Sequence, residues 1–140
     1  MSQFIVKVPI YAELGKVKKK KHYLNLNLLR NRVGHVNNNI KKEFKRIITP
    51  SLPIGEMHFE YYSLEYVLFI PNKLRRDVSN VCSVIDKNFG DTIVELGIVP
   101  EDNYYHLQSI SYKLGGYDEK GKGYCIVTVK EQKYEDMLHM

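Results

Sequence analysis

The sequence predicts one α+β domain over residues 1–140, with a mixed or antiparallel sheet packed against two main helices. Three observations support this prediction. The chain has 140 residues, enough for a single hydrophobic core. Hydrophobic residues make up 44% and charged residues 26%, as is typical of globular domains. Stretches in which apolar residues alternate follow stretches in which they recur at helical spacing.

The first 30 residues predict two strands joined by a basic turn. Residues 4–11 are rich in β-branched and aromatic side chains, and Pro9 places this strand at a sheet edge because proline donates no ladder hydrogen bond. Leucines and asparagines alternate in residues 23–29, as one buried strand face requires. Lysines fill the segment between these stretches, so we expect a hairpin with a lysine-rich tip.

The first main helix is expected over residues 33–48. Its apolar residues recur at intervals of three and four and form one stripe, while most of its lysines and arginines fall on the other face. Asn37 or Asn38 is the expected N-cap. Pro50 ends the helix because proline lacks an amide hydrogen and disfavours helix in the preceding residue.

The second main helix is expected after Asp77, with Gly90 as its stop and a shorter helix over residues 91–96. Three further strands are predicted by runs of β-branched and aromatic residues. They are residues 61–70, which we expect at the centre of the sheet, 104–114 and 123–131.

The net charge favours a polyanionic partner, and nucleic acid is the leading class. Lysine and arginine total 21 against 16 acidic residues, which gives a formal charge of +5. Cys82 and Cys125 lack zinc-site spacing and are expected as buried core residues of a reducing compartment. No apolar run approaches the roughly 20 residues of a membrane span, so we expect a cytoplasmic protein without membrane association.

Two short motifs combine acids and bases in a way that suits phosphodiester chemistry. Arg75, Arg76 and Asp77 lie between a predicted strand and a predicted helix, and Glu101 and Asp102 precede another strand. Carboxylates that converge on Mg²⁺ let the ion polarise a phosphate and lower the pKa of an attacking water. Arginines beside them would hold the nonbridging oxygens.

The order of these motifs resembles that of the RusA-type Holliday-junction resolvases of phages and prophages. The similarity covers residues 75–80, the helix that follows them and residues 97–102. It implies a small α+β fold and a homodimer. It also implies Mg²⁺-dependent endonuclease cleavage of four-way DNA junctions in DNA recombination and repair, in a bacterial or phage-infected cell.

The resemblance assigns roles to individual residues. Asp77 and Asp102 match catalytic, metal-binding aspartates, and Glu101 lies in the adjacent acidic position. The chain departs from the family pattern at two positions, with Ser79 in place of a second aspartate and Ser83 in place of a lysine. The side chains expected to contact DNA are Arg75, Arg76, Asn80, Lys18, Lys19, Lys20 and Lys21.

Simpler interpretations remain open for each of these residues. Asp77 suits an N-cap of the second helix, Glu101 and Asp102 suit a solvated turn, and the lysines suit a solvated loop. Asp86 is expected at the surface or in a salt bridge, or as a spare metal ligand. The alternative function is therefore a catalytically weakened or inactive RusA-like DNA-binding module, and a third is a partner-binding protein without a nucleic-acid role.

Overall fold

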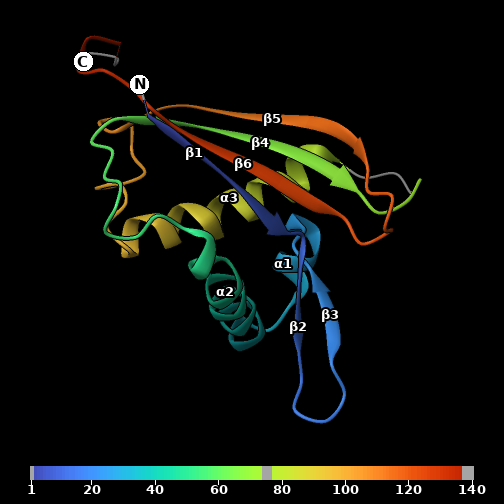
Figure 1. The fold of residues 1–140 in the computed structure, drawn as a ribbon. Helices are drawn as coiled ribbons and strands as arrows, with labels where there is room; N and C mark the ends of the chain where they lie inside the picture. Colours follow the sequence, from blue (N-terminus) through green and yellow to red (C-terminus); the bar gives the residue numbers. More distant parts are fainter. Residues whose placement is uncertain (1, 74–76, 137–140) are drawn as a thin grey trace.

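The computed structural model describes residues 2–73 and 77–136 and has the predicted α+β fold. Figure 1 shows a four-stranded sheet with its helices gathered on one face, and a two-stranded hairpin that projects away from it. In chain order the elements are β1 (Gln3–Pro9), β2 (Tyr11–Leu14), β3 (Lys20–Tyr23), α1 (Leu26–Asn31), α2 (Gly34–Ile48), β4 (Tyr62–Ile70), α3 (Val78–Glu95), β5 (Leu107–Tyr117) and β6 (Tyr124–Glu131), with 3-10 turns at Thr49–Ser51 and Tyr134–Asp136.

The sheet is mixed, with the strand order β1-β6-β4-β5. β6 runs antiparallel to both β1 and β4, whereas β4 and β5 are parallel and are connected through α3. β1, which contains Pro9, lies at one edge, and β4 lies inside the sheet. Both placements confirm the sequence predictions.

One hydrophobic core lies between the sheet and the helices. Every second residue of β4 is buried toward the helices, as the period of a strand dictates. Cys82 and Cys125 are free, fully buried thiols, as expected. Among the described residues, no helix is both long enough and apolar enough to cross a membrane. The largest fully buried side chains are Tyr62, Tyr66, Phe44, Phe89, Leu24, Ile48, Leu68, Ile85, Ile93 and Ile98.

The N-terminal hairpin differs in its strands from the prediction. β1 pairs with β6, and the hairpin is formed by β2 and β3. The expected strand over residues 23–29 is wrong, because its second half belongs to α1. Asn25 is the reason: its Oδ1 accepts from the amide nitrogens of Asn27 and Leu28 at 2.9 and 3.4 Å and so caps the helix. Leu26 and Leu29, three residues apart, pack against the core.

α2 confirms the predicted first helix, but not its cap. It begins at Gly34 after Val33, which makes no side-chain capping hydrogen bond. Asn37 and Asn38 lie inside the helix, so the expected N-cap is wrong. Asn37 instead donates through Nδ2 to the carbonyl oxygen of Leu29 at 2.9 Å, a contact with a residue of α1 that sequence spacing does not indicate.

α3 runs without interruption through Gly90 to Glu95, so the expected stop at Gly90 and the separate helix over 91–96 are wrong. Gly90 is buried, and the carboxylate of Asp102 lies 3.8 Å from the position that a Cβ on Gly90 would occupy. Gly97, with φ +76°, follows the helix end in the left-handed conformation that glycine favours. Packing around Gly90 therefore outweighs its low helix propensity.

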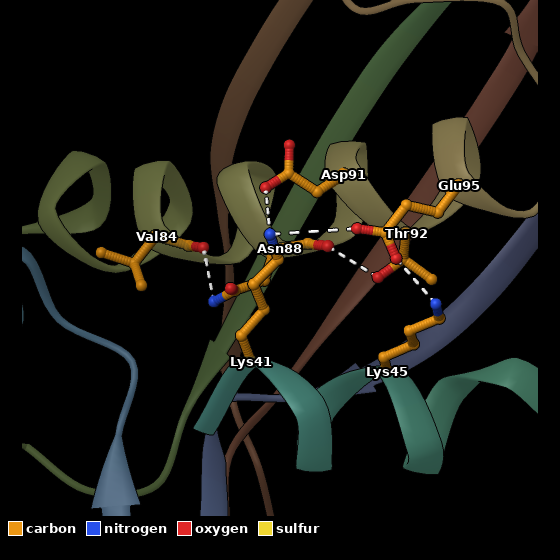
Figure 2. A network of polar contacts seen from close by, with 7 residues as sticks. All are labelled: Lys41, Lys45, Val84, Asn88, Asp91, Thr92 and Glu95. Atoms are coloured by element: carbon orange, nitrogen blue, oxygen red, sulfur yellow. Dashed lines mark hydrogen bonds and ion pairs between the residues drawn. The ribbon is translucent and has the colours of Figure 1, made fainter. Parts of the chain in front are cut away.

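Polar contacts fasten α2 to α3 (Figure 2). Lys41 Nζ lies 2.8 Å from Asp91 Oδ2, and Lys45 Nζ lies 2.7 Å from Glu95 Oε2. The hydrogen bond to Asp91 raises the pKa of Lys41. The buried Asn88 side chain donates to the carbonyl oxygen one turn earlier in α3 at 3.1 Å, so it is satisfied within its own helix. The two ion pairs join α2 to α3, the helix that Asp77 caps.

Candidate functional site

Asp77 is the N-cap of α3, as the simpler interpretation expects. Its Oδ1 accepts from the hydroxyl and from the amide nitrogen of Ser79, at 2.8 and 3.0 Å. These two hydrogen bonds, the hydroxyl first, hold the pKa of Asp77 below its usual value. The residue that replaces the family's second aspartate thus acts as a donor to the first. Asp77 is exposed and anionic.

Asp102 lies at a different place along α3. Its carboxylate is beside Gly90, which follows Asp77 by 13 residues. An α-helix rises about 1.5 Å per residue, so about 20 Å of helix separates the two positions. The neighbouring Glu101 supports this position of Asp102. Its backbone carbonyl oxygen accepts from the hydroxyl of Tyr62, the first residue of β4, at 2.9 Å. Asp77 follows the opposite end of β4, so the two predicted catalytic residues are not brought together in one chain.

The acid that lies near Asp102 is Asp86. It lies one helical turn before Gly90 and is half-buried, and Tyr66 donates its hydroxyl to Asp86 Oδ1 at 2.6 Å. Burial raises the pKa of Asp86, the hydrogen bond from Tyr66 opposes this shift, and the negative charge of Asp102 adds to it. The expected salt bridge of Asp86 is absent from the described residues, and a buried tyrosine takes its place.

The surroundings of Asp86 are aromatic. Burial raises the pKa of Tyr66 well above its ordinary value. The pKa of Tyr112, which makes an edge contact with Tyr66 at 5.8 Å between ring centroids, is raised to about 12 by burial and by the charge of Asp86. Both phenols therefore stay protonated near neutral pH. No sequence signal indicates this group, since Asp86 and Tyr66 are 20 residues apart on different elements.

The ligand set expected for Mg²⁺ is not assembled in one chain. Within residues 2–73 and 77–136, no three His, Cys, Asp or Glu side chains gather closely enough to hold a metal ion. The Glu101 carboxylate accepts from the side chain of Asn103, its own turn neighbour. Asp77, Glu101 and Asp102 of a single chain therefore do not fit one ion.

The predicted DNA-contacting residues fall into three groups. Arg75 and Arg76 lie outside the described residues. Asn80 is half-buried in the first turn of α3, where its amide nitrogen donates to the carbonyl oxygen of Asp77 at 3.1 Å. The lysine tip, Lys18, Lys19, Lys20 and Lys21, is exposed over the β2–β3 turn and the start of β3.

The lysine tip is available to a ligand. None of its side chains forms a salt bridge with a described residue. Lys21 Nζ lies 4.8 Å from the centroid of the Tyr11 ring, which orients one of the four ammonium groups. The hairpin carries these charges away from the sheet (Figure 1).

Comparison with known proteins adds no family assignment. No protein-family model matches the chain, and no curated protein matches its sequence. The resemblance to RusA-type resolvases stays a prediction from the residues named above.

Proposed function

We propose that the protein binds branched DNA through its phosphate groups. The observation that carries this proposal is the lysine tip, which stands on a projecting hairpin in a chain of formal charge +5. A lysine without an ion-pair partner gives up little protein interaction when it binds a phosphate, and each such phosphate releases condensed counterions from DNA. The tip therefore suits binding that does not depend on base sequence.

The activity that we propose for this binding is structure-specific endonuclease cleavage, as in the RusA-type resolvases that the chain resembles. Exposed, anionic Asp77 directly before α3, with Asn80 in the first turn of that helix, supports it. The proposal includes Mg²⁺ as cofactor, a homodimer, and a place in DNA recombination and repair in the cytoplasm of a bacterial or phage-infected cell. Since Asp77 and Asp102 of one chain are far apart, an ion bound by both would need Asp102 from the second protomer.

The second candidate is a RusA-like module that binds DNA without cutting it. Two observations favour it: about 20 Å of helix between the positions of Asp77 and Asp102, and Ser79 in place of an acid. In this case Asp77 serves as a helix cap only.

A nicking assay on a synthetic four-way junction, with Mg²⁺ or with a chelator, separates the two candidates. The endonuclease nicks the junction only with Mg²⁺. Asp77→Asn then abolishes nicking with equal or tighter binding, because asparagine keeps the cap and removes a negative charge. A wild type that binds but does not nick, and that gains cleavage in Ser79→Asp, identifies the binding module. Absence of junction binding at low salt contradicts both.

The homodimer has its own test. Sedimentation should give twice the chain mass of 16.4 kDa. If each metal site takes Asp77 from one protomer and Asp102 from the other, mixing inactive Asp77→Asn with inactive Asp102→Asn restores about a quarter of the sites by random pairing. No recovery in verified mixed dimers would show that the two residues do not share a site across the interface.

A further inference from the structure

A second group of lysines surrounds a groove of about 330 Å³ between β1 and the turn that joins β5 to β6. Lys7 comes from β1, and Lys120 and Lys122 come from the turn. We call this the lysine groove. Asp118 is the acid that lines it, and the ring of Tyr124 forms part of its wall.

The Asp118 side chain holds the turn by accepting hydrogen bonds from the turn's backbone. Its carboxylate accepts from the amide nitrogens of Lys120, Lys122 and Gly123 at 3.0, 3.2 and 2.8 Å. These hydrogen bonds, that of Lys120 first, lower the pKa of Asp118, so it is anionic near neutral pH. A carboxylate occupied by three backbone donors fixes the turn that presents Lys120 and Lys122.

Aromatic rings position the third lysine. Lys7 Nζ lies 4.3 Å from the centroid of the Tyr124 ring. The Tyr124 ring stacks on Phe69, with 4.7 Å between centroids and 18° between ring planes. Phe69 in turn lies over Gly115, where a Cβ would come within 2.6 Å of Phe69 Cζ. Rings from two strands therefore support Lys7, whose ammonium group lies over a π face.

The lysine groove carries three positive charges against the one negative charge of Asp118, with which Lys7 interacts electrostatically. None of its three lysines forms a salt bridge with a described carboxylate. The turn is fastened to the end of β4, because the Asp118 amide nitrogen donates to the carbonyl oxygen of Ile70 at 2.8 Å. The turn that carries Lys120 and Lys122 therefore lies at the carboxyl end of β4.

We infer that the lysine groove is a second binding site for a DNA strand, in which Lys7, Lys120 and Lys122 contact successive phosphates. This inference rests on the proposed DNA binding. A groove of about 330 Å³ that three lysines line has room for more than one phosphate, so it suits a chain of phosphates better than one small anion. The Tyr124 ring is already stacked on Phe69 and covered by Lys7, so it is not free to stack on a base. The groove therefore recognises the charge of the phosphates and not the base sequence.

The test compares two triple variants that carry the same charge change. Lys7→Gln/Lys120→Gln/Lys122→Gln removes the groove charges. The control Lys42→Gln/Lys87→Gln/Lys133→Gln removes three exposed lysines from other surfaces. Removal of three positive charges takes either chain from +5 to +2. Circular dichroism and thermal unfolding verify that both fold.

Fluorescence anisotropy with a labelled junction at several salt concentrations gives the result. The groove variant should bind on the order of 10-fold more weakly at low salt, and its log–log salt slope should be shallower by about 0.9 for each phosphate that it no longer neutralises. The control should keep the wild-type slope. A groove variant that matches the control overturns the inference and leaves DNA binding intact. A wild type that binds no junction contradicts the proposed function itself.

Lysine acetylation read by mass spectrometry distinguishes a DNA strand from a free anion. Junction DNA should protect Lys7, Lys120 and Lys122 of the wild type from acetylation. Inorganic phosphate at the same ionic strength should not. Equal protection by phosphate alone would make the groove a small-anion site and overturn the inference.

Discussion

Replacing Tyr66 with phenylalanine removes one hydrogen bond from a fully buried side chain. The Tyr66 hydroxyl donates to Asp86 Oδ1 at 2.6 Å. Phenylalanine fills the same space apart from one oxygen, so the variant leaves no large cavity. The change in the free energy of unfolding therefore has two parts. One is the lost hydrogen bond, and the other is the cost of leaving the Asp86 carboxylate without this donor.

The expected cost is about 1.5–3 kcal/mol where Asp86 is ionised, because hydrogen bonds to charged groups fall in that range. Where Asp86 is protonated the bond is between neutral groups, and the cost falls to about 0.5–1.5 kcal/mol. Urea unfolding followed by circular dichroism measures both values.

The pH dependence follows from the sign of the pKa shift. Burial raises the pKa of Asp86, so the native state binds this proton more tightly than the unfolded chain does. The contribution of Asp86 to stability is thus fully present below the ordinary carboxyl pKa. It is lost as the pH rises through the raised pKa of the native state. Tyr66→Phe removes the interaction that lowers this pKa, so its cost should be larger at about pH 8 than at about pH 4.

Asp86→Asn is the matched control, since it keeps an acceptor oxygen and removes the charge. Tyr66→Phe made in that background should cost the same at both pH values. A cost in the wild-type background that does not change with pH would refute the charged hydrogen bond. A cost below about 0.5 kcal/mol would show that the bond contributes nothing measurable.

Three further substitutions test other parts of the structure. Gly123→Ala should destabilise the fold by about 1–3 kcal/mol, because Gly123 has φ +82° and an added Cβ would lie 2.4 Å from Ile10 Cδ1. A lowered melting temperature checks this prediction. Phe44→Ala should cost about 3–5 kcal/mol in urea unfolding, since Phe44 is fully buried between α2 and the sheet. Lys45→Ala should cost at most about 1 kcal/mol, because its partner Glu95 is well exposed, and high salt should shrink the difference.

Local chemistry made some elements predictable. The apolar stripe of residues 33–48 specifies a helix, the alternation in residues 61–70 specifies a half-buried strand, and Pro9 specifies an edge. The capping role of Asp77 is equally local, because its partner is two residues away. In each case the interaction that decides the structure lies within one turn or one strand.

Other features depend on contacts between distant residues. The stop expected at Gly90 fails because Gly90 is buried and because the helix, by continuing, also buries Thr92 and Ile93. The strand expected over residues 23–29 fails because Asn25 caps a helix whose leucines reach the core. The helix propensities of residues such as glycine and alanine differ by about 1 kcal/mol. The free energy gained by burying one apolar side chain is larger than this difference.

The α+β class, the basic character, and the positions of the acids and lysines along the chain follow from the residues alone. Packing between segments sets which of these side chains meet. It separates Asp77 from Asp102 by about 20 Å of α3, places Asp102 near Asp86, and joins Lys7 to a turn more than a hundred residues later. The physical reason is that charge and periodicity are properties of a segment, whereas a site is a set of distances fixed by packing between segments.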